Sequence, residues 1–237
     1  MNLHNRITVY WDERSSAFNE LRQTELHSKN ATSWLQLLRG YLPMGNPLKI
    51  LDIGTGTGFF SFLLAADGHQ VTGIDASEQM IFYARENAKK YASTASFLTM
   101  DAENLQFEDS VFDIVLSRNL TWTLPHVQTA YREWHRVLKP GGTLLNFDSD
   151  YGNCSFSKDL RPDGIHCHIE NRLLDECTQI KDQLLVSSQA RPSWDIDLLN
   201  KTGFSLISCT EDISKVVHTD PQLQYEDIPL FSICAKK

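Results

Sequence analysis

Three glycines stand at every second position, at Gly54, Gly56 and Gly58, between a short apolar run and an amphipathic one. The run before them, residues 50–53, is predicted to be a buried parallel strand, and residues 59–66 are predicted to be a helix. Glycine is needed where the backbone takes a positive φ or where a ligand must touch bare backbone. A glycine turn ahead of a helix also places the first helical N–H groups against a bound molecule. The spacing therefore predicts a nucleotide-type cofactor site at the carboxyl end of this strand.

An acidic residue closes the next predicted strand, residues 70–74. The carboxylate of Asp75 is placed to accept hydrogen bonds from both ribose hydroxyls of an adenosine, as in dinucleotide-binding folds. The alternative is that Asp75 only caps the helix that begins near Ser77. The glycine loop beside it favours the ribose role.

The glycine pattern separates two cofactor classes. A dinucleotide fingerprint would need glycine or alanine at position 59, where this chain has Phe59. The observed pattern is Asp-x-Gly-x-Gly-x-Gly from Asp52, and in it the chain resembles the class I S-adenosylmethionine-dependent methyltransferases. The run Leu-Lys-Pro-Gly-Gly at residues 138–142 matches a further recurrent motif of that family, and the likeness covers about residues 45–148. The resemblance implies S-adenosyl-L-methionine as the methyl donor and S-adenosyl-L-homocysteine as the product.

The resemblance also implies which residues hold the cofactor. Asp101 and Ala102 are expected at the adenine, and Arg118 is expected to pair with the cofactor carboxylate, with a solvated loop arginine as the alternative. Tyr10 is expected to meet the cationic sulfonium or, alternatively, to pack within an N-terminal helix. The predicted cofactor residues are Asp52, Gly54, Thr55, Gly56, Gly58, Asp75, Ala76, Asp101, Ala102, Glu103, Ser117, Arg118, Asn119 and Tyr10.

Methyl transfer from a sulfonium requires donor and acceptor in line with water excluded, and it requires a base only when the nucleophile arrives protonated. The predicted catalytic residues are His126 and Asp148. Histidine suits the role of a base because its side chain ordinarily titrates near neutral pH, and Asp148 ends a predicted strand. No metal site is predicted, because His166 and His168 are accompanied by neither a CxxC pair nor a histidine at i+4. The predicted substrate-binding residues are Trp122, Tyr151, His166 and Trp194.

Alternating apolar and amphipathic segments predict an α/β fold, a doubly wound, mostly parallel seven-stranded sheet of Rossmann-like form. The resemblance adds one antiparallel edge strand. The glycines of 138–142 are expected to turn the chain from a helix into a strand. The predicted strands are 48–53, 70–74, 95–99, 112–117, 142–148, 204–209 and 229–235, and the predicted helices after the first 45 residues are 59–66, 79–91, 127–138 and 165–190.

One domain is predicted over residues 1–237, with a helical lid (1–45), a cofactor core (46–148), an acceptor-side cap (149–195) and C-terminal strands (196–237). The net charge of −8 without a cluster of lysines and arginines argues against a nucleic-acid partner. No apolar run is long enough for a membrane span, and the five cysteines lack paired spacing, so a cytoplasmic protein with reduced thiols is expected. A monomer or homodimer is expected.

The predicted function is methyl transfer from S-adenosylmethionine to a small soluble metabolite through N, O, S or C, with a likeness to the quinone C-methyltransferase-like group. Two alternatives stay open. One is a non-catalytic S-adenosylmethionine-binding sensor or interaction module. The other is an NAD-dependent oxidoreductase built on the same kind of sheet.

Overall fold

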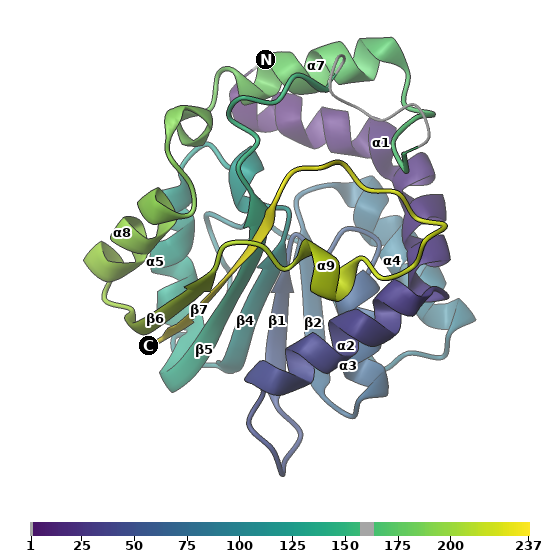
Figure 1. Ribbon diagram of the computed structural model, residues 1–237. Helices are drawn as coiled ribbons and strands as arrows, with labels where there is room; N and C mark the ends of the chain where they lie inside the picture. Colours follow the sequence, from purple (N-terminus) through teal and green to yellow (C-terminus); the bar gives the residue numbers. More distant parts are fainter. Residues whose placement is uncertain (1, 157–163) are drawn as a thin grey trace.

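A seven-stranded sheet runs through the centre of the computed structural model, which describes residues 2–156 and 164–237 (Figure 1). The strand order is β3-β2-β1-β4-β5-β7-β6. Strands β1 to β5 are parallel, and β7 is antiparallel to both of its neighbours. This confirms the predicted fold class. The strands are β1 (Lys49–Ile53), β2 (Gln70–Asp75), β3 (Ser96–Thr99), β4 (Phe112–Arg118), β5 (Leu138–Ser149), β6 (Ser205–Thr210) and β7 (Leu230–Lys236).

Helices cover both faces of the sheet, and a pair of helices crosses the edge where the parallel strands end (Figure 1). The crossing pair is α1 (Leu3–Leu26) and α7 (Asn171–Lys181). The other helices are α2 (Lys29–Tyr41), α3 (Phe59–Ala66), α4 (Glu78–Lys90), α5 (Val127–Val137), α8 (Ser193–Thr202) and α9 (Ser214–Val217), with 3-10 turns η1 (Thr121–Thr123) and η2 (Leu185–Ser188). No helix in the described ranges is both long enough and apolar enough to cross a bilayer.

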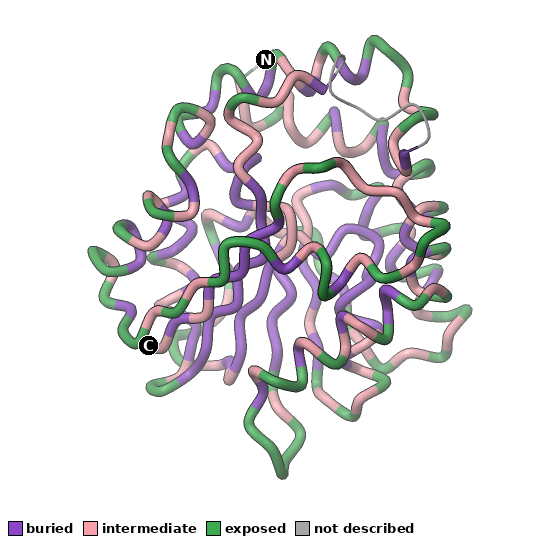
Figure 2. The backbone as a smooth tube through the Cα atoms, in the orientation of Figure 1, coloured by how far each residue is buried: buried purple, intermediate pink, exposed green. Residues whose placement is uncertain are grey.

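The apolar core lies in two layers because successive side chains of a strand point to opposite faces. On β1, Ile50 packs with Trp34 of α2 and Phe60 of α3, whereas Leu51 packs on the other face with residues of α5 and α8. The central strands are therefore buried along almost their whole length (Figure 2). Burial on both faces accounts for the continuous apolar runs of the sequence.

Local signals predicted the first half of the sheet well. Helix α3 has the predicted bounds, and the Ser77 side chain accepts a hydrogen bond from the Met80 N–H at 3.0 Å, as expected of an N-cap. One prediction was wrong. Residues 138–142 belong to β5 itself, where Gly141 at φ +76° accompanies a shift in the pairing with β4. The expected antiparallel pairing lies at this end of the sheet, where β7 pairs with the edge strand β6.

The segment predicted as one helix over 165–190 is broken into several pieces. Helix α7 spans only Asn171–Lys181, and the chain then turns so that Leu184 and Val186 enter the core. Helix α8 follows, which was not predicted. Core packing by turn residues overrides local helical periodicity here. Residues 157–163 of the predicted cap lie outside the described residues.

Candidate functional site

A pocket opens at the carboxyl ends of β1, β2 and β4, beneath α1 and α7. Helix α1 contributes one stripe of residues to its lining at a spacing of three or four, including Ile7, Trp11, Arg14 and Phe18. Residues at that spacing share one face of a helix. The same pocket receives the glycine loop, the ends of β2, β3 and β4, and part of α7.

The glycine loop forms a tight floor for this pocket. Gly56 has φ +54°, and a Cβ built on it would lie 2.9 Å from Cε1 of Phe18. The buried Asp52 carboxylate accepts hydrogen bonds from the hydroxyls of Thr55 and Ser61, each at 2.7 Å. Burial raises the pKa of Asp52 to about 6, although these hydrogen bonds oppose the rise. Backbone without a side chain is thus presented to the pocket.

Asp75 holds the glycine loop and still faces the pocket. Its Oδ2 accepts from the Gly56 N–H at 3.0 Å, and its Oδ1 accepts from the Ser77 N–H at 2.9 Å. Each carboxylate oxygen can accept a further hydrogen bond, so two donors such as ribose hydroxyls can still be accommodated. Burial raises the pKa of Asp75 to about 6. The N-cap of α4 is Ser77, not Asp75. Asp75 instead accepts a hydrogen bond from the backbone N–H of Ser77.

Residues that follow β3 also line the pocket. Asp101 and Ala102 line the pocket together with His4 of α1, whose Nε2 lies 3.9 Å from Asp101 Oδ2. Thr55 and Ala76 also line it, as do Gly54 and Tyr10.

Three of the predicted cofactor residues do not line the pocket. Gly58 instead forms the left-handed start of α3 at φ +100°. The Glu103 carboxylate is taken by the N–H and Nδ1 of His126, at 2.6 and 2.8 Å. Ser117 is buried and donates to Asn146 Oδ1 at 2.9 Å.

Arg118 lines the pocket but is paired within the protein. Its two terminal nitrogens donate to the buried Glu25 carboxylate at 2.8 and 3.1 Å, and Arg22 and the Tyr225 hydroxyl bind the same carboxylate. Burial alone would raise the pKa of Glu25, but the two arginines hold it well below the usual range. The predicted bidentate grip of Arg118 on the cofactor carboxylate is therefore replaced by its pairing with Glu25. Two guanidinium groups and one carboxylate leave this cluster, Arg22–Glu25–Arg118, with one surplus positive charge.

Asn119 follows Arg118 and also lines the pocket. The indole Nε1 of Trp122 donates a hydrogen bond to the backbone carbonyl of Asn119 at 3.1 Å, so this bond does not involve the Asn119 side chain. Oδ1 of Asn119 is buried without a hydrogen-bond partner among the described residues. A buried amide oxygen of this kind is an open acceptor for a donor on a ligand.

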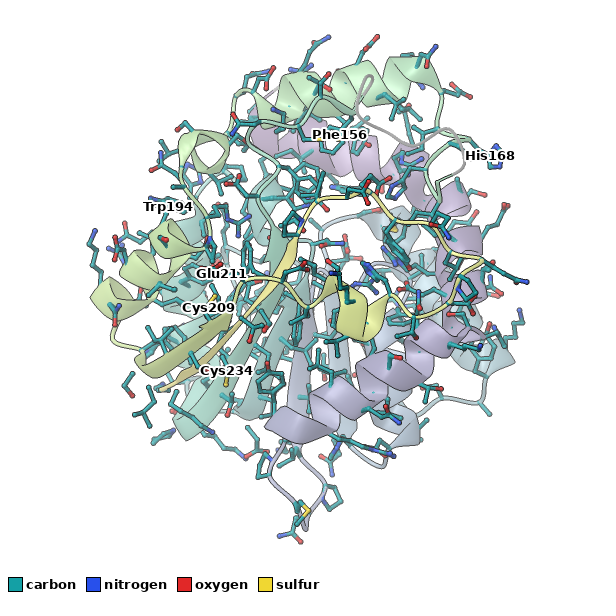
Figure 3. The ribbon with its side chains drawn as sticks, viewed as in Figure 1. Phe156, His168, Trp194, Cys209, Glu211 and Cys234 are labelled. Carbon is teal, nitrogen blue, oxygen red and sulfur yellow. The ribbon has the colours of Figure 1, made fainter. Side chains whose placement is uncertain are left out.

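Three aromatic residues line the pocket together: Trp122, Tyr151 and Phe156. The ring centroid of Trp122 lies 4.8 Å from that of Tyr151 and 5.5 Å from that of Phe156. These three residues are called the aromatic wall below, and Phe156 was not predicted. Trp194 is not part of it, because it lies on α8 at the flank of the molecule, away from Phe156 (Figure 3).

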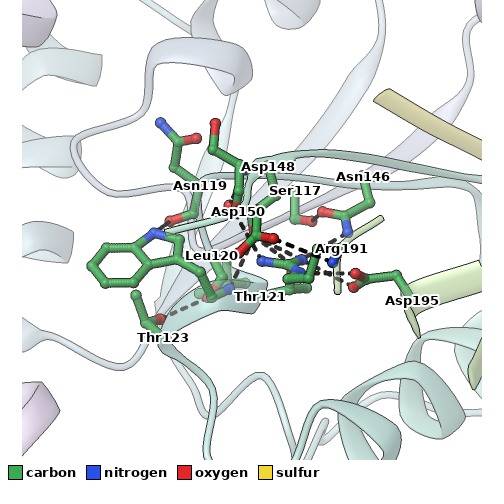
Figure 4. Close-up of polar contacts among 12 residues, drawn as sticks. Ser117, Asn119, Leu120, Thr121, Thr123, Asn146, Asp148, Asp150, Arg191 and Asp195 are labelled. Atoms are coloured by element: carbon green, nitrogen blue, oxygen red, sulfur yellow. Dashed lines mark hydrogen bonds and ion pairs between the residues drawn. The ribbon is translucent and has the colours of Figure 1, made fainter. Parts of the chain in front are cut away.

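The two predicted catalytic residues lie outside the pocket lining. The His126 side chain is 72% exposed and is paired with Glu103. Asp148 is fully buried, accepts from Thr121 Oγ1 and the Trp122 N–H, and pairs with Arg191 at 3.3 Å (Figure 4). Asp148 thus holds the loop after β4 in place, since the register of β5 turns its side chain into this network and not toward the pocket.

A different histidine, His166, lines the pocket. Its Nδ1 lies 2.7 Å from Oε1 of Glu226, and both residues belong to the lining. Burial alone would raise the pKa of Glu226, but the contact with His166 lowers it. His166 was predicted as a substrate-binding residue, whereas its partner was missed because Glu226 is remote in sequence and lies in an irregular segment.

Comparison of the sequence with known proteins shows which protein family it resembles. Residues 51–146 match a family model described as a methyltransferase domain. The chain is 43% identical over 101 residues to a malonyl-[acyl-carrier protein] O-methyltransferase of Erwinia pyrifoliae, and 31% identical over 144 residues to a demethylmenaquinone methyltransferase of Bacteroides fragilis. These segments cover 43% and 59% of this chain but only 37% and 58% of the relatives' own lengths.

A solved structure extends the likeness over nearly the whole chain. A Haemonchus contortus phosphoethanolamine N-methyltransferase 2, in complex with phosphomonomethylethanolamine and S-adenosylhomocysteine, superposes with a TM-score of 0.71 at 19% identity. The superposition covers 98% of this chain and 60% of that one. At this identity the likeness concerns the fold.

Proposed function

We propose that this chain, whose residues 51–146 match a methyltransferase-domain family model, is an S-adenosylmethionine-dependent methyltransferase that transfers a methyl group to a small-molecule acceptor. The observation that carries the proposal is one pocket lined by two unlike groups of residues. Gly56, Asp75 and Asp101 suit a nucleoside, and the aromatic wall suits an apolar acceptor body beside it.

The residues present fit the cofactor. Asp75 has free lone pairs for the ribose hydroxyls, and Gly56 allows close approach where a Cβ would meet Phe18. The unpaired Oδ1 of Asn119 suits the cofactor ammonium, and the surplus charge of the Arg22–Glu25–Arg118 cluster suits its carboxylate. When bound, S-adenosylmethionine supplies an activated methyl group on a cationic sulfur.

The protein's part in the reaction is then to position the acceptor and to exclude water. Helices α1 and α7 cover the pocket, and the aromatic wall limits where the acceptor can lie. We assign proton acceptance from a protonated nucleophile to Nε2 of His166, because Glu226 occupies Nδ1 and orients the ring. The lid (1–45), core (46–148), cap (149–195) and C-terminal strands (196–237) are proposed as parts of this one domain.

Calorimetric titration with S-adenosylmethionine, S-adenosylhomocysteine and NADH tests the cofactor first. We expect micromolar or tighter binding of the first two, no binding of NADH, and a large loss of affinity in Asp75→Ala. Binding of NADH alone would support the oxidoreductase alternative. Methyl transfer from labelled S-adenosylmethionine to a panel of small acceptors then separates the enzyme from a binding module, which would bind the cofactor and methylate nothing.

A further inference from the structure

Arg14 of α1 is a buried cation whose charge no other described group balances. Its side chain lines the pocket, yet the residue is only 6% exposed. Within the described ranges Arg14 forms no ion pair, and its Nε is buried without a hydrogen-bond partner. A buried charge without a counter-ion costs free energy, so such a group calls for an anion from elsewhere.

The other buried arginines of the described chain show how unusual this is. Arg22 and Arg118 pair with Glu25, and Arg191 pairs with Asp148 and Asp195. Arg14 faces two neutral groups instead. Burial raises the pKa of the Cys177 thiol to about 11 and also raises that of the Tyr10 hydroxyl, and in both cases the charge of Arg14 opposes the rise.

Arg14 shares the pocket-facing stripe of α1 with Phe18, but it also lies beside Cys177 of α7. Asp12, two residues away, binds the Ser77 hydroxyl at 2.5 Å on the α4 side of α1. Two residues on a helix differ in direction by about 200°, so Arg14 points to the other side, toward Cys177 on α7. The Arg22–Glu25–Arg118 cluster already offers the cofactor carboxylate a surplus positive charge.

We propose that Arg14 binds a carboxylate on the methyl acceptor, whose apolar body rests against the aromatic wall of the same pocket. The proposal rests on the proposed function and names its acceptor class, a small carboxylic acid. A guanidinium matches a carboxylate through two parallel hydrogen bonds. The acid then supplies the counter-ion that Arg14 lacks, and its charge distinguishes it from a neutral analogue of the same shape.

The test compares two matched pairs of probes on the protein saturated with S-adenosylhomocysteine: benzoate against benzamide, and butyrate against butyramide. The two members of each pair have nearly the same shape, but the amide is neutral and carries an NH2 group in place of one carboxylate oxygen. We expect the wild type to bind at least one acid about tenfold more tightly than its amide. Arg14→Met should abolish that preference, Arg14→Lys should keep part of it, and Arg172→Met should keep all of it, because Arg172 is 65% exposed and paired with Glu13.

Cofactor titrations of the same variants distinguish the two sources of a carboxylate. We expect Arg14→Met to bind S-adenosylhomocysteine and 5′-methylthioadenosine, which lacks the carboxylate, as the wild type does; this also shows that the variant folds. Selective loss of S-adenosylhomocysteine affinity would assign Arg14 to the cofactor and overturn the proposal. So would the absence of a preference for either acid in the wild type. Failure of the wild type to bind S-adenosylhomocysteine would instead overturn the proposed function.

Discussion

The single carboxylate of Asp75 both holds the glycine loop and faces the pocket. Its pKa of about 6 means that it is ionised above pH 6 and protonated below. We expect S-adenosylhomocysteine affinity to fall as the pH is lowered from 7.5 to 5, by up to about tenfold per pH unit below 6, because the protonated group loses acceptor capacity. Calorimetry over this range checks it, and a flat profile would contradict it. Asp75→Asn should bind more weakly at pH 7.5 and lose most of the pH dependence.

His166 is the second residue-scale prediction. The test uses an acceptor from the methyl-transfer screen that carries a protonated nucleophile. With this acceptor, His166→Asn should lower kcat by about a hundredfold, since a general base contributes at least that much. Cofactor affinity should not change. His126→Asn is the matched control, because His126 is exposed and lies outside the pocket lining. Equal losses in both variants would remove the proton-acceptor role from His166.

Of the residues predicted to hold the cofactor, all but Gly58, Glu103 and Ser117 line the pocket, whereas neither predicted catalytic residue does. Gly56, Asp75 and Asp101 sit at strand ends, and the alternation of strands and helices fixes where strand ends meet. The rest of the lining comes from α1, α7 and an irregular segment near Glu226, which no local period in the sequence brings together. A signal was present on α1, where Arg14 and Arg22 continue an apolar stripe at helical spacing.

Helix α1 acts at the scale of an element, because it packs directly on the glycine loop. Gly56→Val would place side-chain atoms against Phe18 and put a β-branched residue at φ +54°, a strained conformation. We expect at least a tenfold loss of S-adenosylhomocysteine affinity by calorimetry. Gly40→Ala is the control, because nothing lies within 4 Å of its added Cβ. Unchanged affinity in Gly56→Val would move the cofactor away from this loop.

At the scale of the whole molecule, Glu25 joins three distant parts of the chain, through Arg22, Arg118 and Tyr225. Glu25→Gln leaves two guanidinium groups without their carboxylate, and we expect it to lower the free energy of unfolding by about 3–5 kcal/mol in urea denaturation. Glu86→Gln, in the exposed pair with Lys89, should cost at most about 1 kcal/mol. If both substitutions lowered the free energy of unfolding by a similarly small amount, Glu25 would not be what joins these three parts of the chain.

The pH dependence of stability follows from the same residue. The folded-state pKa of Glu25 lies below its unfolded value of 4.5, so its contribution is present above that pH. It is lost as the pH falls further. Acid denaturation of Glu25→Gln should therefore be less steep than that of the wild type.

The strand order has a consequence for how the chain is made. Strand β6 precedes β7 in the chain but pairs with β7 alone, which in turn pairs with β5. On the ribosome, β6 therefore emerges with no strand to join, and β5 keeps an open edge until β7 has been synthesised and inserted between them. Open edges invite pairing with other chains. Until β7 is in place, the edges of both β5 and β6 are therefore open to pairing with other chains.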